Sequence, residues 1–212
     1  MRKQETSMSK SIIFDLGGVL IDWNPRHLYR KLFPGDEAAM ERFLGEVCTM
    51  EWHLQHDAGR PFVETCAELK LMHPGHDALI DAFGDRHDEM TAGAIEGTVA
   101  LLERLAANGV PLYAITNYPA ETFPMARRKF PFLALFGDVA VSGVERVLKP
   151  SAELFNILLQ RNNIVPGEAI FIDDAIKNVD AARALGLHAI HFRSADQLEQ
   201  EMLQLGVLRA GA

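Results

Sequence analysis

The chain has 212 residues, of which 48% are hydrophobic and 24% charged, an ordinary globular composition that excludes the disordered and fibrous classes. Its formal net charge of −8 argues against a nucleic-acid-binding surface, because the overall field repels polyanions. No signal segment is recognisable and no apolar run approaches the ~18 residues of a membrane span, so we expect a cytoplasmic protein that does not enter a membrane.

The polar residues 1–9 are expected to form a flexible N-terminal tail, and the first element is an apolar run that begins at Ser11 and ends at Asp15. Its β-branched and aromatic residues predict a buried parallel strand with Asp15 at the carboxyl end, where open α/β sheets bind ligands. Gly17 and Gly18 follow, and without Cβ atoms their backbone N–H groups could approach an anion. Taken alone, the stretch fits an ordinary Asp-Gly turn equally well.

Helical spacing dominates the next part of the chain, and no β-branched run interrupts it. About 70 residues of helix are far too many for a connection between two strands of one sheet, so residues 23–92 are predicted to form an inserted helical cap. Five helices are expected there, starting near Pro25, at Asp36, near Glu51 and at Phe62, with the last carrying Leu79, Phe83 and Met90.

Strands and helices alternate through the remainder of the chain, which predicts an α/β fold with a doubly wound parallel sheet, built from residues 10–22 and 93–212. The expected strands are 111–117, 138–143, 169–174 and 189–192, and the expected helices are 98–108, 120–130, 151–160, 176–185 and a final one capped by Ser194.

Polar side chains stand at or just beyond the ends of these strands, in the same topological position as Asp15. They are Thr116-Asn117, Lys149-Pro150 and Asp173-Asp174. Because parallel strands bring their carboxyl ends to one edge of the sheet, we expect these groups to converge on one crevice. Carboxylates from two strands suit Mg²⁺, Thr116 and Lys149 suit phosphate oxygens, and Asp15 is placed to attack phosphorus.

These residues, with Asn178 after them, resemble in order and spacing the four motifs of the haloacid dehalogenase-like (HAD) hydrolase superfamily, over nearly the whole chain from Ile12 to about Phe192. The resemblance implies that Asp15 is a nucleophile that becomes an aspartyl-phosphate. It further implies a phosphate-binding pair, Thr116 and Lys149, and a Mg²⁺ site formed by Asp15, Asp174 and the Gly17 carbonyl with Asp173 in support. Asn117 and Asn178 would be supporting hydrogen-bonders, and a small phosphorylated metabolite would be the substrate of a monomer or homodimer.

One position departs from the family's pattern. Phosphatases of this superfamily usually carry a second Asp two residues after the nucleophile, as general acid and base, and here that position is Gly17. Losing general acid–base catalysis typically costs ~10²–10⁴-fold in rate. The sequence most resembles the branch of α-D-glucose-1-phosphate phosphatases, which shares this feature. A substitute acid is sought among Asp22, His53, His56 and Asp57.

Two other hypotheses stay open. A metal-independent 2-haloacid dehalogenase also lacks an Asp at the Gly17 position, but the pair Asp173-Asp174 would repel a carboxylate substrate unless a cation were present. A catalytically weak binding or regulatory module is supported by Gly17 alone. In the cap, the region Trp52 to Arg60 is the candidate for contact with substrate, and Trp23 could line the cleft between cap and core.

Overall fold

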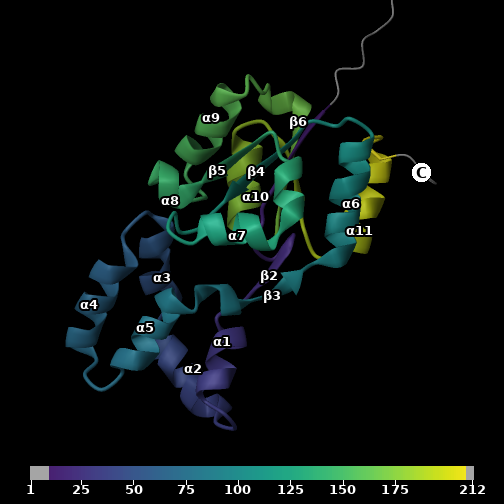
Figure 1. The fold of residues 1–212 in the computed structure, drawn as a ribbon. Coiled ribbons are helices and arrows are strands. Elements are labelled where there is room, and N and C mark those ends of the chain that lie inside the picture. The colour runs from purple at the N-terminus through teal and green to yellow at the C-terminus, as the bar shows by residue number, and fades with distance from the viewer. Residues whose placement is uncertain (1–9, 209–212) are drawn as a thin grey trace, which may run out of the picture.

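The structure, a computed structural model, describes residues 10–208, so the expected N-terminal tail lies outside the described residues. Its centre is a five-stranded sheet in the order β5-β4-β1-β6-β7, with every pairing parallel (Figure 1). The strands are β1 Ser11–Phe14, β4 Leu112–Thr116, β5 Asp138–Val141, β6 Ala169–Asp173 and β7 His188–His191. The predicted α/β fold with a doubly wound parallel sheet is confirmed.

Helices cover both faces of this sheet because side chains alternate along the strands. Ile12 and Phe14 of β1 pack into one core, and Ile13 between them packs into the other. The first core is closed by α6 Glu96–Ala107, α7 Phe123–Lys129, the 3₁₀ helix Pro131–Leu135 and α11 Ala195–Gln204. The second is closed by α9 Ala152–Arg161 and α10 Ile176–Ala184, while α8 Ser142–Glu145 and the 3₁₀ helix Pro166–Glu168 are short connections.

A helical bundle stands apart from the sheet in Figure 1 and has a hydrophobic core of its own, centred on Tyr29, Phe43 and Phe83. Apolar residues at helical spacing build this core, as the sequence pattern indicates. The bundle consists of α1 Arg26–Leu32, α2 Glu37–Glu46, α3 Met50–Asp57, α4 Phe62–Met72, α5 Asp77–Asp85 and the 3₁₀ helix His87–Met90.

The chain enters and leaves this bundle through a small antiparallel sheet that the sequence analysis did not predict. Strand β2 Ile21–Trp23 pairs with β3 Thr91–Ala94. The expectation of an uninterrupted helix up to Met90 is wrong, because α5 ends at Asp85 and Met90 closes the following 3₁₀ helix. The small residues of β3 give little strand signal, and the strand exists because β2, some 70 residues earlier, supplies its hydrogen-bonding partner.

Other boundaries differ by a few residues from those expected. Helix α6 begins at Glu96 rather than at Thr98, and β5 ends at Val141 because Ser142 already starts α8. Among the described residues, no helix combines the length and apolar character that crossing a bilayer requires.

Candidate active site

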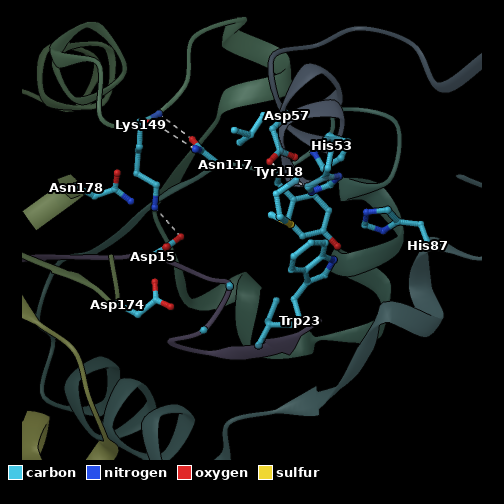
Figure 2. A pocket seen from close by; sticks show the side chains of 16 residues that line it. Asp15, Trp23, His53, Asp57, His87, Asn117, Tyr118, Lys149, Asp174 and Asn178 are labelled. Atoms are coloured by element: carbon cyan, nitrogen blue, oxygen red, sulfur yellow. Dashed lines mark hydrogen bonds and ion pairs between the residues drawn. The ribbon is translucent and has the colours of Figure 1, made fainter. Parts of the chain in front are cut away.

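A cavity of about 360 Å³ lies between the carboxyl ends of the central strands and the helical bundle (Figure 2). Core residues form its floor, and bundle residues, chiefly from α3, form its wall. The floor includes Asp15, Gly17, Gly18, Asn117, Tyr118, Pro119, Lys149, Asp174 and Asn178, and the wall and its margin include Ile21, Trp23, Met50, His53, Leu54, Asp57 and His87. The predicted convergence of strand-end groups is therefore observed for most of the motif residues.

Lys149 is the centre of the floor. Its ammonium Nζ lies 2.8 Å from Asp15 Oδ1 and 2.7 Å from Asp173 Oδ2, and the side chain is almost fully buried. Asn117 holds the backbone of Lys149 on both sides: Asn117 Oδ1 accepts from the Lys149 N–H (2.8 Å), and Asn117 Nδ2 donates to the Lys149 carbonyl (3.2 Å). Asn117 therefore positions the lysine from a neighbouring strand end.

The two acids after β6 have different surroundings. Asp173 is fully buried, and both its oxygens accept hydrogen bonds, from Asn178 Nδ2 (3.0 Å to each) and from the Ala175 N–H (2.8 Å to Oδ1). Asp174 is exposed toward the cavity, and its carbonyl accepts from His191 Nε2. Asp173 is thus engaged mainly by protein groups, whereas the Asp174 carboxylate remains available to a ligand.

Lys149 is paired with two carboxylates, Asp15 and Asp173, and the carboxylate of Asp174 lies near both acids. Burial raises the pKa of Asp15, with Lys149 opposing and Asp173 adding to the shift, and burial also raises the pKa of Asp174. The pKa of Lys149 is raised, since Asp15 and Asp173 outweigh the burial that would lower it. Asp15, Asp173 and Asp174 each offer an oxygen within 4.8 Å of the others. This set of hard oxygen donors with excess negative charge fits a divalent cation such as Mg²⁺.

The two glycines after Asp15 differ in their geometry. Gly18 has a φ of +72°, its N–H donates to the Ile21 carbonyl (2.9 Å), and a Cβ atom there would lie 2.3 Å from Asp174 Oδ2. Its N–H is consequently engaged within the turn, whereas the sequence analysis expected it to be free to approach an anion. A Cβ on Gly17 would meet nothing within 4 Å.

Thr116 ends β4 and is almost fully buried, but it is not among the residues that line the cavity. Its predicted contact with phosphate stays a prediction.

The structure distinguishes the four candidates for the missing general acid by their positions. Asp22 is exposed and pairs with His27 outside the cavity (3.1 Å), and His56 is buried in the bundle against Thr65 Oγ1. His53 and Asp57, one turn apart on α3, both line the cavity and are both 4% exposed.

Within the region Trp52 to Arg60, only part of α3 faces the cavity. Trp52 packs inside the bundle, edge-on to Phe83, and Arg60 pairs with Glu68 at the surface. Trp23 does line the cavity and stacks on His53, with ring centroids 4.9 Å apart.

Sequence reasoning did not single out His87 of the wall or Tyr118 of the floor. Tyr118 directly follows the Thr116-Asn117 motif, and this position beyond a strand end was a usable signal. His87 offered none, because it precedes the unpredicted strand β3. Burial lowers the pKa of His53 to about 3 and that of His87 to about 4, so both imidazoles face the cavity as neutral groups.

Comparison with known proteins agrees with this geometry. The model of the haloacid dehalogenase-like hydrolase family matches residues 10–186. Sesquiterpene phosphatase astK of Aspergillus oryzae is 29% identical over 204 residues, which cover 92% of this chain and 96% of that protein. The phosphorylated carbohydrates phosphatase of Thermotoga maritima is 26% identical over 200 residues, covering 86% and 84%.

Among solved structures, the HAD family enzyme BT-2542 of Bacteroides thetaiotaomicron has been crystallised in complex with magnesium and inorganic phosphate. It matches with a TM-score of 0.67 at 23% identity, covering 87% of this chain and 94% of that one. At this identity the likeness concerns the fold.

Proposed function

Since the chain belongs to the haloacid dehalogenase-like hydrolase family, we propose that it is a Mg²⁺-dependent phosphatase of a small phosphorylated metabolite, with Asp15 as the nucleophile. One observation carries the proposal: Asp15, Lys149 and Asp174 line one cavity, and the fully buried Asp173 pairs with Lys149 beside it. A nucleophilic carboxylate, a cation for phosphate oxygens and donors for a metal are the groups that phosphoryl transfer requires. Relatives named as phosphatases support it.

The contacts of Asp15 support one of its oxygens as the attacking atom. Lys149 Nζ (2.8 Å) and the Leu16 N–H (2.7 Å) both bond Oδ1, so Oδ2 is the oxygen left to attack phosphorus and form the aspartyl-phosphate. Water then hydrolyses this acyl phosphate. Lys149 stays beside the transferring phosphoryl group and stabilises its negative charge. Mg²⁺ held by Asp15, Asp174 and the Gly17 carbonyl would neutralise further charge on the phosphoryl oxygens.

The helical bundle over residues 23–92 is proposed to act as the cap of a core formed by residues 10–22 and 93–212. Its helix α3 contributes to the cavity wall, so the bundle would keep bulk water from the aspartyl-phosphate and select the leaving group. The small β2-β3 sheet is the pair of strands through which the cap would join the core.

The test is a screen of the purified protein against sugar, acyl, nucleotide and isoprenoid phosphates, with Mg²⁺ and with EDTA. We expect turnover that requires the metal. Asp15→Asn should reduce turnover to background because the amide keeps the shape and removes the nucleophile. Asp22→Asn serves as the matched control, since Asp22 lies outside the cavity, and should retain activity.

Two results would contradict the proposal. Full turnover in EDTA would favour the dehalogenase hypothesis, which a 2-haloacid substrate tests directly. An active Asp15→Asn enzyme would exclude covalent catalysis by this residue.

A further inference from the structure

Asp57 is a buried carboxyl group that the mechanism above leaves without a task. It is the last residue of α3, 4% exposed, and it lines the same cavity as Asp15 and Lys149 (Figure 2). Within the part of the chain that the structure describes, its Oδ1 has no hydrogen-bond partner, and its Oδ2 lies 3.5 Å from His53 Nε2. A buried acid with one oxygen unpartnered, at the wall of a substrate cavity, is poised to bond a ligand.

We propose that Asp57 supplies, from the helical bundle, the general acid and base that the chain lacks at Gly17. The assignment rests on the proposed phosphatase function and extends it, because it names the residue that protonates the leaving group. Bundle and core would then each contribute one carboxyl group to catalysis: Asp15 attacks phosphorus and Asp57 transfers the proton.

The position of Asp57 is fixed by the core as well as by its own helix. The Asp57 carbonyl accepts a hydrogen bond from Ser142 Oγ (2.6 Å), and Ser142 Oγ accepts from the Tyr118 N–H (3.0 Å). Two residues on, Gly59 approaches the core so closely that a Cβ atom would lie 2.7 Å from the Gly143 carbonyl oxygen. The end of α3 is therefore tied to α8, which directly follows β5, and through Ser142 to Tyr118, which lines the cavity.

The surroundings of Asp57 suit proton transfer near neutral pH. Burial raises its pKa to about 7, with the charge of Lys149 opposing the shift. The facing imidazole of His53 is neutral, because burial and the neighbouring His87 and His56 lower its pKa to about 3. An acid whose pKa lies near the working pH can both donate and recover a proton during turnover.

The other titratable groups of the cavity are less suitable. The pKa values of His53 and His87, about 3 and about 4, mean that neither carries an imidazolium proton to donate at neutral pH, while burial raises the pKa of Tyr118 to about 12. Among the described residues of the bundle wall, Asp57 alone combines a suitable pKa with an unpartnered oxygen.

The reaction balances with these two carboxyl groups and water. In the first step Asp15 Oδ2 bonds to phosphorus, the bond between phosphorus and the ester oxygen breaks, and the Asp57 proton passes to that oxygen, releasing the alcohol. In the second step a water oxygen bonds to phosphorus, the Asp15–phosphorus bond breaks, and a water proton returns to Asp57. The sum is phosphate ester plus water giving alcohol plus phosphate.

The first experiment compares wild type and Asp57→Asn on two kinds of substrate, alkyl phosphates and p-nitrophenyl phosphate, with Mg²⁺ present. Alkoxide leaving groups need the proton, so kcat for alkyl phosphates should fall by ~10²–10⁴-fold with little change in KM. The pre-steady-state burst of p-nitrophenolate, which leaves without help, should change by less than about 10-fold. Asp22→Asn, the control carboxylate outside the cavity, should match the wild type.

The second experiment moves the acid to the core. A Cβ on Gly17 has open space, so Gly17→Asp can be accommodated. In the Asp57→Asn background it should recover at least about 10-fold of the lost alkyl-phosphate activity, whereas in the wild type, which already has its acid, it should add little. Thermal unfolding shows whether Asp57→Asn is folded. If it folds poorly, the comparison of Gly17→Asp with the wild type still tests the proposal.

The outcomes separate this proposal from the one on which it rests. A wild type that hydrolyses no phosphate ester overturns the phosphatase function itself. Three results overturn the role of Asp57 but leave the phosphatase function intact. In the first, the wild type turns over and Asp57→Asn is as active as the wild type. In the others, Asp57→Asn slows release of both leaving groups equally, or Gly17→Asp in the wild type gives a large gain that depends on the leaving group.

Discussion

Gly17 and Gly18 are adjacent, but the structure needs a glycine at only one of them. Gly18 adopts a left-handed conformation, and the Asp174 carboxylate occupies the space that a side chain would fill. Gly17 has neither constraint. A Cβ atom could thus be accommodated at Gly17, so a steric clash at that atom does not account for the absence of the family's usual acid.

The first residue-scale prediction contrasts these two glycines. Gly18→Ala should destabilise the protein by about 1 kcal/mol from the left-handed backbone alone. It should also displace Asp174, and misplacing a catalytic group by about 1 Å can cost ~10²-fold in rate. Thermal unfolding and kcat measure both effects. Gly17→Ala is the matched control and should stay within a few-fold of wild type, so equal behaviour of the two variants would contradict this account.

At the residue scale, the sequence predicts the groups that stand at strand ends and fails for those placed by tertiary contacts. Asp15, Lys149 and Asp174 follow predicted strands, and parallel pairing brings them together. Asp57 was one of four candidates without a geometry. Its place at the cavity wall and its unpartnered oxygen distinguish it from the others, and the bond between its carbonyl and Ser142, 85 positions away in the chain, is a tertiary contact that local sequence does not show.

At the scale of elements, the same contrast appears between the helices and the small sheet. Helices α2 and α5 of the bundle have amphipathic spacing, and Gly59 and Pro61 separate α3 from α4, so the order of the helices could be predicted. Strand β3 is the segment Thr91–Ala94, whose small residues carry no alternation of apolar and polar side chains. Its strand conformation depends on β2, and a pairing over that separation is not visible in local sequence.

The contact between α3 and α8 gives the element-scale prediction. Ser142→Ala removes the hydroxyl that bridges the Asp57 carbonyl and the Tyr118 N–H, leaving two buried backbone groups without partners. Stability should fall by about 1–3 kcal/mol. Because α3 then holds Asp57 less firmly, kcat should fall more for alkyl phosphates than for p-nitrophenyl phosphate.

Ser151→Ala is the matched control for this prediction. Ser151 caps the N-terminus of α9 on the core surface, so its loss should cost ~0.5–2 kcal/mol of stability. It should leave the ratio of the two activities unchanged. If Ser142→Ala lowers stability yet keeps the wild-type ratio, the contact stabilises the protein without positioning Asp57.

At the scale of the whole molecule, the net negative charge opposes binding of the proposed anionic substrate. The chain carries a formal net charge of −8, and three of its carboxylates, those of Asp15, Asp173 and Asp174, cluster near Lys149 at the cavity. A phosphate ester is therefore repelled at long range and must be held by local positive charge. A divalent cation at Asp15 and Asp174 would offset the negative charge of the floor. Metal binding would then stabilise the folded state as well as support catalysis.

The last prediction follows from this charge balance. Folding brings Asp15, Asp173 and Asp174 together, and the unfolded chain does not, so Mg²⁺ should bind the folded state selectively and stabilise it. At ~100 times its dissociation constant, the metal should add about 2.7 kcal/mol, a rise in Tm of roughly 5–10 °C for a chain of this size. Thermal unfolding with MgCl₂, against NaCl of equal ionic strength, measures the shift.

Asp174→Asn should abolish most of this shift and, without metal, should raise stability slightly, because it removes a carboxylate whose pKa is already raised by burial and by Asp173. Asp180→Asn, at the exposed Arg183 pair of α10, is the matched control and should keep the full Mg²⁺ response. An undiminished response in Asp174→Asn would place the cation elsewhere on the acidic surface and remove the support that the carboxylate cluster gives to a metal-dependent reaction.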